Sequence, residues 1–518
     1  MKNIVLVLLI ALVGSCSKPT EEKQVSLSTH KYAVPAFADS TSFQRLQVAF
    51  PLVDSIFARH ARNNHFPSIV YGVVAGGQLI HTGSTGYANI REKRLADSKT
   101  LFRIASMSKS FTAMAILKLR DEGRLSLTDP VTQYIPEFAK AGTLTTDAPP
   151  VTVQQLMTMA AGFPEDNPWG DRQLDDTDQE LLDLVSNGVS FSNAPGTTFE
   201  YSNLGFALLG RIITQVADMP YQQYITEQIM KPIGMHDAKW EYEEVPVETL
   251  AHGYQWEAGT WREIPLMHDG AYGAMGGLIC SIEDFAKYMS VHLEAWPPRN
   301  EAERAPVRRS SIREMHQPWR FNNLFADAKN RQGEICPVAI GYGYGLGWRK
   351  DCKGTVRVSH SGGLPGFGSE WRIYPDYGIG VVSFSNHTYG APGSANAAVL
   401  DTLIALARLQ PRVLPPSDLL NRRKEQIARL LPAWTEPVDS IFAENFFADE
   451  ALERRRAAAE NIFKEAGAIQ DVKNLVPENQ LRGTFTLVGE HKNIQVFFTL
   501  TPERAALIQQ LDLTLVDR

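Results

Sequence analysis

The stretch at residues 101–119, LFRIASMSKSFTAMAILKL, constrains the fold of this chain more than any other. Ser106 stands near its start and Lys109 follows three residues later. The residues after Lys109 are apolar on every side, which favours a helix buried nearly all round. Because positions i and i+3 share one face of a helix, the Ser106 hydroxyl and the Lys109 amine can approach each other. The fold must also give this buried lysine polar partners.

This spacing favours a nucleophilic serine activated by a lysine. A helix N-terminus offers free N–H groups and partial positive charge, which help a hydroxyl to lose its proton. Burial disfavours the charged form of a lysine, so Lys109 can act as a base near neutral pH. The same Ser-x-x-Lys spacing also occurs at Ser15/Lys18 and Ser28/Lys31, where no apolar helix follows. Chance occurrence is therefore the competing interpretation of the pattern alone.

The length and net charge of the chain limit the classes of protein to which it can belong. A chain of 518 residues is long enough for two or more domains. A net charge of −7 without a long basic run argues against nucleic acid as a partner. No Cys/His cluster has the spacing of a metal site, and no His-Glu-x-x-His sequence occurs. We therefore expect neither a metal nor another cofactor.

The first 16 residues have the pattern of an export signal. Lys2 precedes an apolar run at residues 4–13, which is short for a membrane span, and small residues lead to Cys16. The ending VGSC resembles a bacterial lipobox, which implies a lipidated Cys16; an ordinary signal peptide is the alternative. Residues 17–39 are polar and favour a tether. We expect an exported protein of the bacterial cell envelope, lipid-anchored and facing the periplasm or the cell surface.

Residues 40–410 are expected to form one domain. Helical periodicity runs over residues 43–61, and a hairpin with Gly76-Gly77 at its turn joins strands at 68–75 and 78–82. Further helices are expected to begin at residue 151, to begin just after Asn203 and run through Val216, and to lie near 221–230 and 282–292. Strands follow at 356–360, 369–374 and 379–385. The pattern predicts an α/β (α+β) fold: an antiparallel sheet built from both ends of the domain, flanked by helices, with a mainly helical insert.

Two further segments carry open interpretations. The acidic stretch at residues 165–178 is either a solvated loop or a lid over a pocket with Trp169 as a contact. Cys336 and Cys352 flank the run YGYGLGW at residues 342–348, and the two thiols could pair in an oxidising compartment.

The end of the chain is expected to form a separate unit. Residues 411–432 contain a proline-rich linker, PRVLPP, and a helix at 418–431. Residues 433–518 are expected to form a small α+β accessory domain, with helices at 440–447 and 452–466 and strands at 483–488 and 494–500. No catalytic residue is expected in this domain.

Three short motifs occur in a fixed order: SMSK at 106–109, YSN at 201–203 and HSG at 360–362. Together they resemble the serine β-lactamase and penicillin-binding protein superfamily, especially its class C-like branch. The segments GRLSLTDP at 123–130, PIGM at 232–235 and GYGYGLGW at 341–348 also resemble this superfamily. The resemblance covers residues 44–406. The C-terminal unit loosely resembles an extra domain found on some such hydrolases.

The resemblance implies a role for each motif. Ser106 would attack a carbonyl and form an acyl-enzyme, and Tyr201, held near Lys109, would take the serine proton. Asn203 would bind the acyl side of the substrate. His360, Gly362 and Gly363 would line the substrate site. The backbone N–H groups of Ser106 and Gly363 would form an oxyanion hole.

Two departures from the superfamily bear on the substrate. His360 stands where many members have lysine, and a histidine is largely uncharged at neutral pH. The sequence MTMAAG at 157–162 replaces the more usual His-Thr-Ser-Gly. Arg357 could supply charge, but strand alternation should place it on the face opposite His360. We therefore expect poor activity on β-lactams, which carry a carboxylate.

Three functions stay open at this point. The first is hydrolysis of an amide or peptide bond in a small substrate that contains D-amino acids and relates to the cell wall. The second is a carboxylesterase that uses the same acyl-enzyme. The third is a penicillin-binding or sensing lipoprotein that barely turns over and whose C-terminal domain engages an unknown protein partner.

Overall fold

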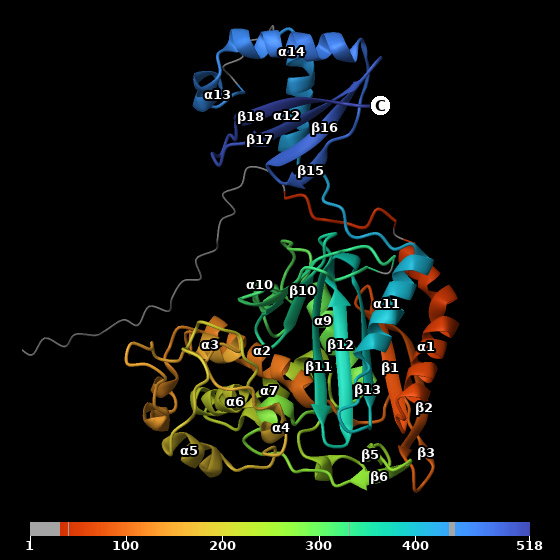
Figure 1. Ribbon diagram of the computed structural model, residues 1–518, viewed down its shortest axis with the longest axis vertical. Coiled ribbons are helices and arrows are strands. Elements are labelled where there is room, and N and C mark those ends of the chain that lie inside the picture. Colours follow the sequence, from red (N-terminus) through yellow and green to blue (C-terminus); the bar gives the residue numbers. More distant parts are fainter. Residues whose placement is uncertain (1–31, 40, 331, 435–440) are drawn as a thin grey trace, which may run out of the picture. The chain divides into compact units, whose positions relative to one another are not determined.

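The computed structural model describes residues 32–39, 41–330, 332–434 and 441–518 (Figure 1). The chain divides into one compact unit at Val34–Val413 and a second that includes Leu414–Arg518. The predicted signal segment, Cys16 and most of the predicted tether lie outside the described residues. None of the described helices is long and apolar enough to cross a lipid bilayer.

A nine-stranded sheet forms the centre of the first unit. Its order is β3-β2-β1-β13-β12-β11-β10-β9-β8, and every neighbouring pair is antiparallel. The strands are β1 (Ser68–Ala75), β2 (Gln78–Asn89), β3 (Arg94–Leu95), β8 (Arg320–Phe325), β9 (Val338–Tyr342), β10 (Gly347–Lys350), β11 (Val356–Leu364), β12 (Phe367–Tyr374) and β13 (Ile379–Ser385). Since β1 pairs directly with β13, the prediction of one sheet built from both ends of the domain is confirmed.

Both predicted hairpins are present. Gly76 and Gly77 turn β1 into β2 with φ angles of +58° and +76°, which glycine adopts without a Cβ penalty. The turn between β12 and β13 ends at Gly378, whose φ is +62°. Strand β2 continues to Asn89, seven residues beyond the predicted end at Thr82. Two short pairs lie outside this sheet: β4 (Phe102–Arg103) with β7 (Ile279–Cys280), and β5 (Gly253–Glu257) with β6 (Thr260–Ile264).

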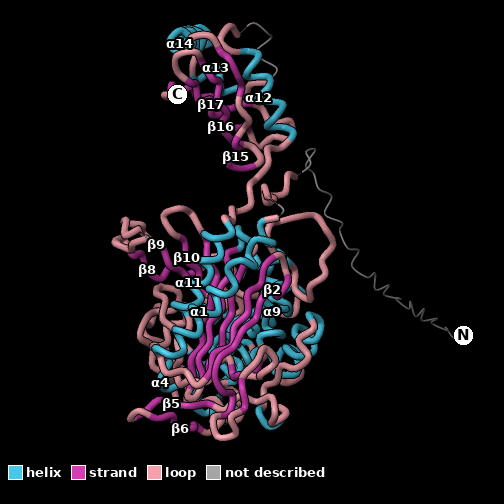
Figure 2. Tube along the Cα trace, turned by 90° about the vertical axis from the view of Figure 1, so that its right-hand side faces the viewer, coloured by secondary structure: helices cyan, strands magenta, loops and turns pink. Residues whose placement is uncertain are grey.

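Helices cover both faces of the sheet (Figures 1 and 2). On one face, α1 (Phe50–Asn63) and α11 (Gly393–Ala407) bury Phe57, Val399 and Leu403 against β1 and β13. The opposite face carries the larger core, built around α2 (Ser108–Asp121), α6 (Asn203–Ala217) and α9 (Ile282–Glu294). The shorter helices are α3 (Val153–Met157), α4 (Asn167–Gly170), α5 (Asp178–Ser186), α7 (Tyr221–Ile225), α8 (Gly273–Gly276) and α10 (Arg309–Met315). The middle of the chain is therefore mainly helical, as predicted.

The segment at 101–119 is not one continuous helix. Phe102 and Arg103 form strand β4, Ala105–Met107 forms a 3₁₀ turn, and α2 begins only at Ser108. Ala105 has a φ of +52°, which no residue inside a right-handed helix adopts. Ser106 therefore lies in a tight turn at the entrance to α2.

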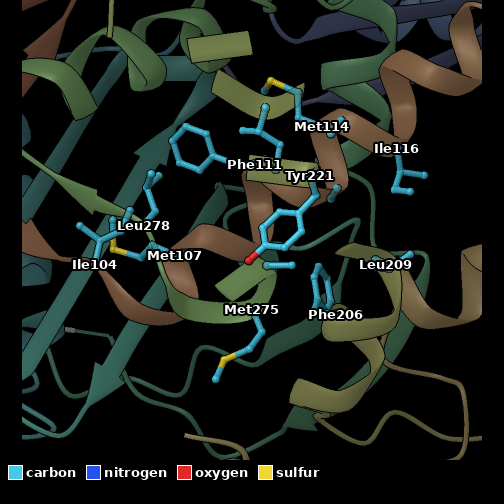
Figure 3. Packing of buried hydrophobic residues seen from close by; sticks show 14 of the residues in the cluster. Ile104, Met107, Phe111, Met114, Ile116, Phe206, Leu209, Tyr221, Met275 and Leu278 are labelled. Atoms are coloured by element: carbon cyan, nitrogen blue, oxygen red, sulfur yellow. The ribbon is translucent and has the colours of Figure 1, made fainter. Parts of the chain in front are cut away.

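The rest of α2 is buried all round, as its composition predicts. Figure 3 shows Phe111 and Met114 of α2 near Tyr221, with Phe206 and Leu209 of α6 nearby. These side chains have essentially no exposed surface, apart from a few per cent of Tyr221. Burial of each large apolar side chain contributes about 1.5–3 kcal/mol, so the core fixes α2 and the Ser106 turn in place.

The helix predicted at 43–61 is divided in two. Ser42–Ala49 forms a 3₁₀ helix and α1 begins at Phe50. Pro51 explains the division, because proline has no N–H to donate inside a helix but fits its first turn.

A close contact joins β11 to the Ser106 turn. A Cβ added to Gly362 would lie 2.3 Å from the Ile104 carbonyl oxygen and 2.5 Å from Ser369 Oγ. The Ser369 hydroxyl in turn donates to the Ile104 carbonyl at 2.7 Å. Glycine at 362 therefore lets the strand approach the backbone beside the serine.

We expect Gly362→Ala to destabilise the protein by about 1–3 kcal/mol, because backbone atoms must move to admit the methyl group. Acylation should also slow, since the Ser106 turn shifts. Denaturant unfolding measures the first effect and labelling by a serine-directed reagent the second. Gly205→Ala is the matched control: its new Cβ meets nothing closer than 3.8 Å, and α6 should gain about 0.5–1 kcal/mol. If Gly362→Ala and the wild type had the same free energy of unfolding, the close approach of Gly362 to the Ile104 carbonyl would be contradicted.

The second unit is a small α+β structure with its own core. Its elements are α12 (Asp418–Leu430), α13 (Glu444–Asp449), α14 (Leu452–Ala466), β14 (Ile469–Val472), β15 (Val476–Asn479), β16 (Arg482–Gly489), β17 (Asn493–Leu500) and β18 (Ile508–Val516). The predicted strands at 483–488 and 494–500 and the helix at 452–466 are confirmed. Helix α13 begins at Glu444 rather than at Ser440, which lies outside the described residues. Strands β14, β15 and β18 were not predicted.

Cys336 and Cys352 form a disulfide that closes a loop of sequence separation 16. The pairing left open by the sequence is thus made in the structure. Cys280 is buried and free.

Candidate active site

Ser106 and Lys109 meet as their spacing predicts. Lys109 Nζ donates to Ser106 Oγ at 3.0 Å, to Asn203 Oδ1 at 2.6 Å and to the Met275 carbonyl oxygen at 2.9 Å. Lys109 has no exposed surface, whereas Ser106 retains 6%. Ser106 therefore lies closer to the surface than the fully buried amine behind it.

Burial sets the protonation of the lysine. It lowers the pKa of Lys109 to about 7, and the nearby carboxylates of Asp171 and Asp166 act in the opposite direction. The Lys109 ammonium also lies 5.0 Å from the centre of the Tyr201 ring and 5.7 Å from that of Phe206. Near neutral pH the amine therefore exists in both protonation states.

Tyr201 lies beside Ser106, immediately before α6. Its hydroxyl is in hydrogen-bonding contact with the Ser106 side chain, which favours the ionised phenol. Burial has the larger effect and raises the pKa of Tyr201 well above its usual range, and Asp171 and Asp166 raise it further. The phenol is therefore protonated in the free protein.

The Asn203 side chain connects the lysine to the amide of Asn167 and the carboxylate of Asp171. Its Oδ1 accepts from Lys109, and its Nδ2 donates to Asn167 Oδ1 at 3.2 Å and to Asp171 Oδ1 at 3.5 Å. Asn203 is fully buried, and both ends of its amide are engaged within the protein. Its expected contact with the acyl side of a substrate stays a prediction.

Asp166 and Asp171 were not singled out from the sequence. Asp166 accepts the backbone N–H groups of Asn203 at 2.6 Å and Leu204 at 2.9 Å, so it caps the N-terminus of α6. Burial raises the pKa of Asp171 to about 6, against the effect of Lys109. Both residues belong to the acidic stretch 165–178, which the sequence marks only as a solvated loop or a lid. Trp169 in the same stretch is 45% exposed.

His360 is bonded on both ring nitrogens. Nδ1 is 2.6 Å from the Ser361 carbonyl oxygen and donates to it, so Nε2 accepts from the Tyr342 hydroxyl at 3.0 Å. Burial, with the Lys109 charge, lowers the pKa of His360 to about 3. The prediction of an uncharged imidazole at neutral pH is therefore confirmed. Tyr342 and Met275 join the site through tertiary contacts; Tyr342 lies in the family-like segment 341–348, whereas no motif contains Met275.

The remaining predicted residues lie on β11. Gly362 packs against the Ser106 turn, whereas a Cβ on Gly363 would lie 3.0 Å from Cδ1 of Tyr389. Their expected roles toward a substrate stay predictions. Among the described residues, no group of three or more His, Cys, Asp or Glu side chains could hold a metal ion.

The antiparallel sheet with its helical layers has the β-lactamase/transpeptidase-like arrangement, and Ser106, Lys109 and Tyr201 form a buried cluster beside it. A profile of the Beta-lactamase family matches residues 53–406, which is more than half of the chain. The chain therefore belongs to the β-lactamase family, within the superfamily that also contains the penicillin-binding proteins.

Two curated relatives align with parts of the chain. Protein flp of Staphylococcus aureus (strain MW2) is 27% identical over 344 residues, which are 64% of this chain and 62% of that protein. Beta-lactamase-like protein 2 of Dictyostelium discoideum is 30% identical over 260 residues, 49% of this chain and 47% of that protein. The chain thus spans less than two thirds of the length of these relatives.

Solved structures share the fold. The octameric penicillin-binding protein homologue from Pyrococcus abyssi superposes with a TM-score of 0.56 at 23% identity, covering 90% of this chain and 99% of that one. A penicillin-binding protein from Bacillus halodurans gives 0.52 at 22% identity, covering 67% of this chain and 98% of that one.

Proposed function

We propose that this protein hydrolyses an amide or peptide bond in a small substrate through an acyl-enzyme on Ser106. The observation that supports this most is the set of acceptors around Lys109: Ser106 Oγ, Asn203 Oδ1 and the Met275 carbonyl. An ammonium group has three donors and satisfies all three. A neutral amine keeps two donors, for Asn203 and Met275, and turns its lone pair toward Ser106. The amine is thus placed to accept the serine proton.

The pKa directions favour Lys109 over Tyr201 as that proton acceptor. Lys109 titrates near neutral pH, whereas Tyr201 is held as the neutral phenol. Tyr201 would then carry a proton from the lysine toward the leaving group once the acyl-enzyme forms. The resemblance assigns the base role to Tyr201, so the two assignments make different predictions for the pH dependence.

The charges around Ser106 favour substrates without a carboxylate near the scissile bond. His360 is neutral and fully hydrogen-bonded, while Asp166 and Asp171 add negative charge. Arg357 lies on the far side of the sheet, in a cleft with residues of α11, as strand alternation predicts. We propose D-aminoacyl amides and related cell-wall fragments as the substrate class.

A substrate panel tests this proposal. D-aminoacyl amides, matched L-aminoacyl amides, simple esters and a β-lactam are offered to the full chain, and intact mass is followed with time. Turnover of D-aminoacyl amides with a transient acyl adduct supports the proposal. Turnover of esters alone makes the protein a carboxylesterase, which the neutral His360 would also suit. A stable adduct without turnover identifies a penicillin-binding or sensing protein.

His360→Lys is expected to improve selectively the turnover of substrates that carry a terminal carboxylate. A lysine supplies the fixed positive charge that the neutral imidazole lacks. The measurement compares kcat/KM for matched substrates with and without the carboxylate, in wild type and variant, between about pH 5.5 and 8.5. If the substitution changed kcat/KM equally for both substrates, His360 would have no role in substrate selection.

For the whole protein we propose anchoring through a lipidated Cys16 in the bacterial envelope. The support is the VGSC sequence after a short apolar run. Mass analysis of the N-terminal peptide, with Cys16→Ser as control, tests it. A mature N-terminus other than modified Cys16 would exclude lipid anchoring.

A further inference from the structure

We propose that a second site, separate from Ser106, binds a phosphate group in a basic cleft on the other face of the sheet. The cleft lies between strands β9–β12 and helix α11 and has a volume of about 570 Å³. It is lined by Arg349, Arg357 and Arg372 from three neighbouring strands and by Lys353. The first unit contains all of these residues.

The strand register places like charges against each other. Arg349 of β10 stands directly opposite Arg357 of β11, and directly opposed residues point to the same face. In such a pair the Cβ atoms are about 4.5–5.5 Å apart. Like charges on two directly opposed side chains are destabilising. A chain of net charge −7 thus holds two guanidinium groups together at one spot.

Acidic groups compensate part of this charge, and two of them, Asp351 and Asp401, line the cleft. Glu370 pairs with Arg372 at 2.7 Å. The Asp351 carboxylate accepts the backbone N–H groups of Lys353 and Thr355, both at 2.9 Å.

Within the described residues, Arg349 forms no ion pair or side-chain hydrogen bond, and Nε of Arg357 is buried without a hydrogen-bond partner. Burial and the Arg372 charge lower the pKa of Arg357 to about 10, while Glu370 acts in the opposite direction, so the guanidinium group stays charged at neutral pH.

A phosphate group fits this arrangement by charge and by shape. Guanidinium groups present parallel N–H donors that match the oxygens of phosphate, and charge-assisted bonds of this kind are the strong ones. Two arginines and a lysine can balance a doubly charged phosphate. The phosphate can belong to a soluble metabolite or to a lipid headgroup, since both offer the same oxygens.

The test measures phosphate binding by the full chain at constant ionic strength. Isothermal titration with inorganic phosphate compares the wild type with Arg357→Gln, Arg349→Gln and the control Arg91→Gln, an exposed arginine outside the cleft. We expect the wild type and Arg91→Gln to bind alike, and the two cleft variants to bind about tenfold more weakly or worse. Without phosphate, Arg349→Gln should unfold at the same temperature as the wild type or higher, because the repulsion is gone.

Vesicles distinguish the two sources. Sedimentation with phosphatidylglycerol vesicles, lost in Arg357→Gln and absent with phosphatidylcholine, identifies a lipid headgroup. Binding of free phosphate without vesicle binding identifies a soluble ligand. Turnover of a simple ester in every variant checks that the Ser106 site is intact. If neither phosphate nor vesicle binding depends on Arg349 or Arg357, the cleft is only a solvated basic surface and the proposal is overturned.

Discussion

Ser106→Ala is expected to abolish hydrolysis and all covalent labelling by serine-directed reagents. Ser106 Oγ accepts a hydrogen bond from the Lys109 amine at 3.0 Å, and it is the nucleophile in the proposed function. Removal of a catalytic nucleophile elsewhere costs a factor on the order of 10⁶ in turnover. Intact mass after incubation with the reagent, together with the rate on the best substrate of the panel, measures both effects.

Ser110→Ala is the matched control for this variant. Ser110 is also buried and stands on α2, where its hydroxyl donates to the Met107 carbonyl at 3.0 Å. Its loss should cost about 1 kcal/mol of stability and leave labelling intact. If the Ser106→Ala variant were labelled at the wild-type rate, the nucleophile would be another residue and the proposed function would be refuted.

Lys109→Ala and Tyr201→Phe are each expected to lower turnover by a factor on the order of 10⁴ or more, and the double variant by little more. The reason is that both groups act on the same proton. Since burial lowers the pKa of Lys109 to about 7, kcat/KM in the wild type should rise about tenfold per pH unit below that pKa and level off above it. The rise reflects deprotonation of the amine as the pH increases.

The pH profile separates the two possible bases. If Lys109 accepts the proton, the rise near pH 7 persists in Tyr201→Phe at a lower rate and disappears in Lys109→Ala. If Tyr201 is the base, Tyr201→Phe removes the rise instead. Additive losses in the double variant would show that the two residues act in separate steps.

Several features of the fold could be predicted because they depend on local patterns. The glycine turn at residues 76–77, the alternation at 356–360 in β11 and the apolar periodicity of α6 and α9 are set by near neighbours in the chain. The starts of α1 and α2 were placed wrongly or only approximately. Pro51 shifts the first to Phe50, and the left-handed Ala105 shifts the second to Ser108.

Parts of the site could not be predicted, because they come from distant segments. Asp166 and Asp171 stand in a stretch whose composition indicates only a loop, yet they surround Asn203 and shift the pKa of Lys109. Met275 contributes a backbone carbonyl, which no side-chain motif can mark. The Arg349–Arg357 pair follows from the register of β10 and β11, and a shift of one residue would have separated the two charges.

The sequence by itself determined that Ser106 and Lys109 approach each other, because a spacing of three residues at the start of a buried helix brings the hydroxyl and the amine to one side. It also determined that a sheet joins the two ends of the first unit, because its strands carry their own alternation and turns. Only the tertiary structure decided which protonation states these groups adopt. Burial of Lys109, Tyr201 and His360 depends on side chains far away in the chain, and the cost of burying a charge exceeds the local effects that a motif reveals.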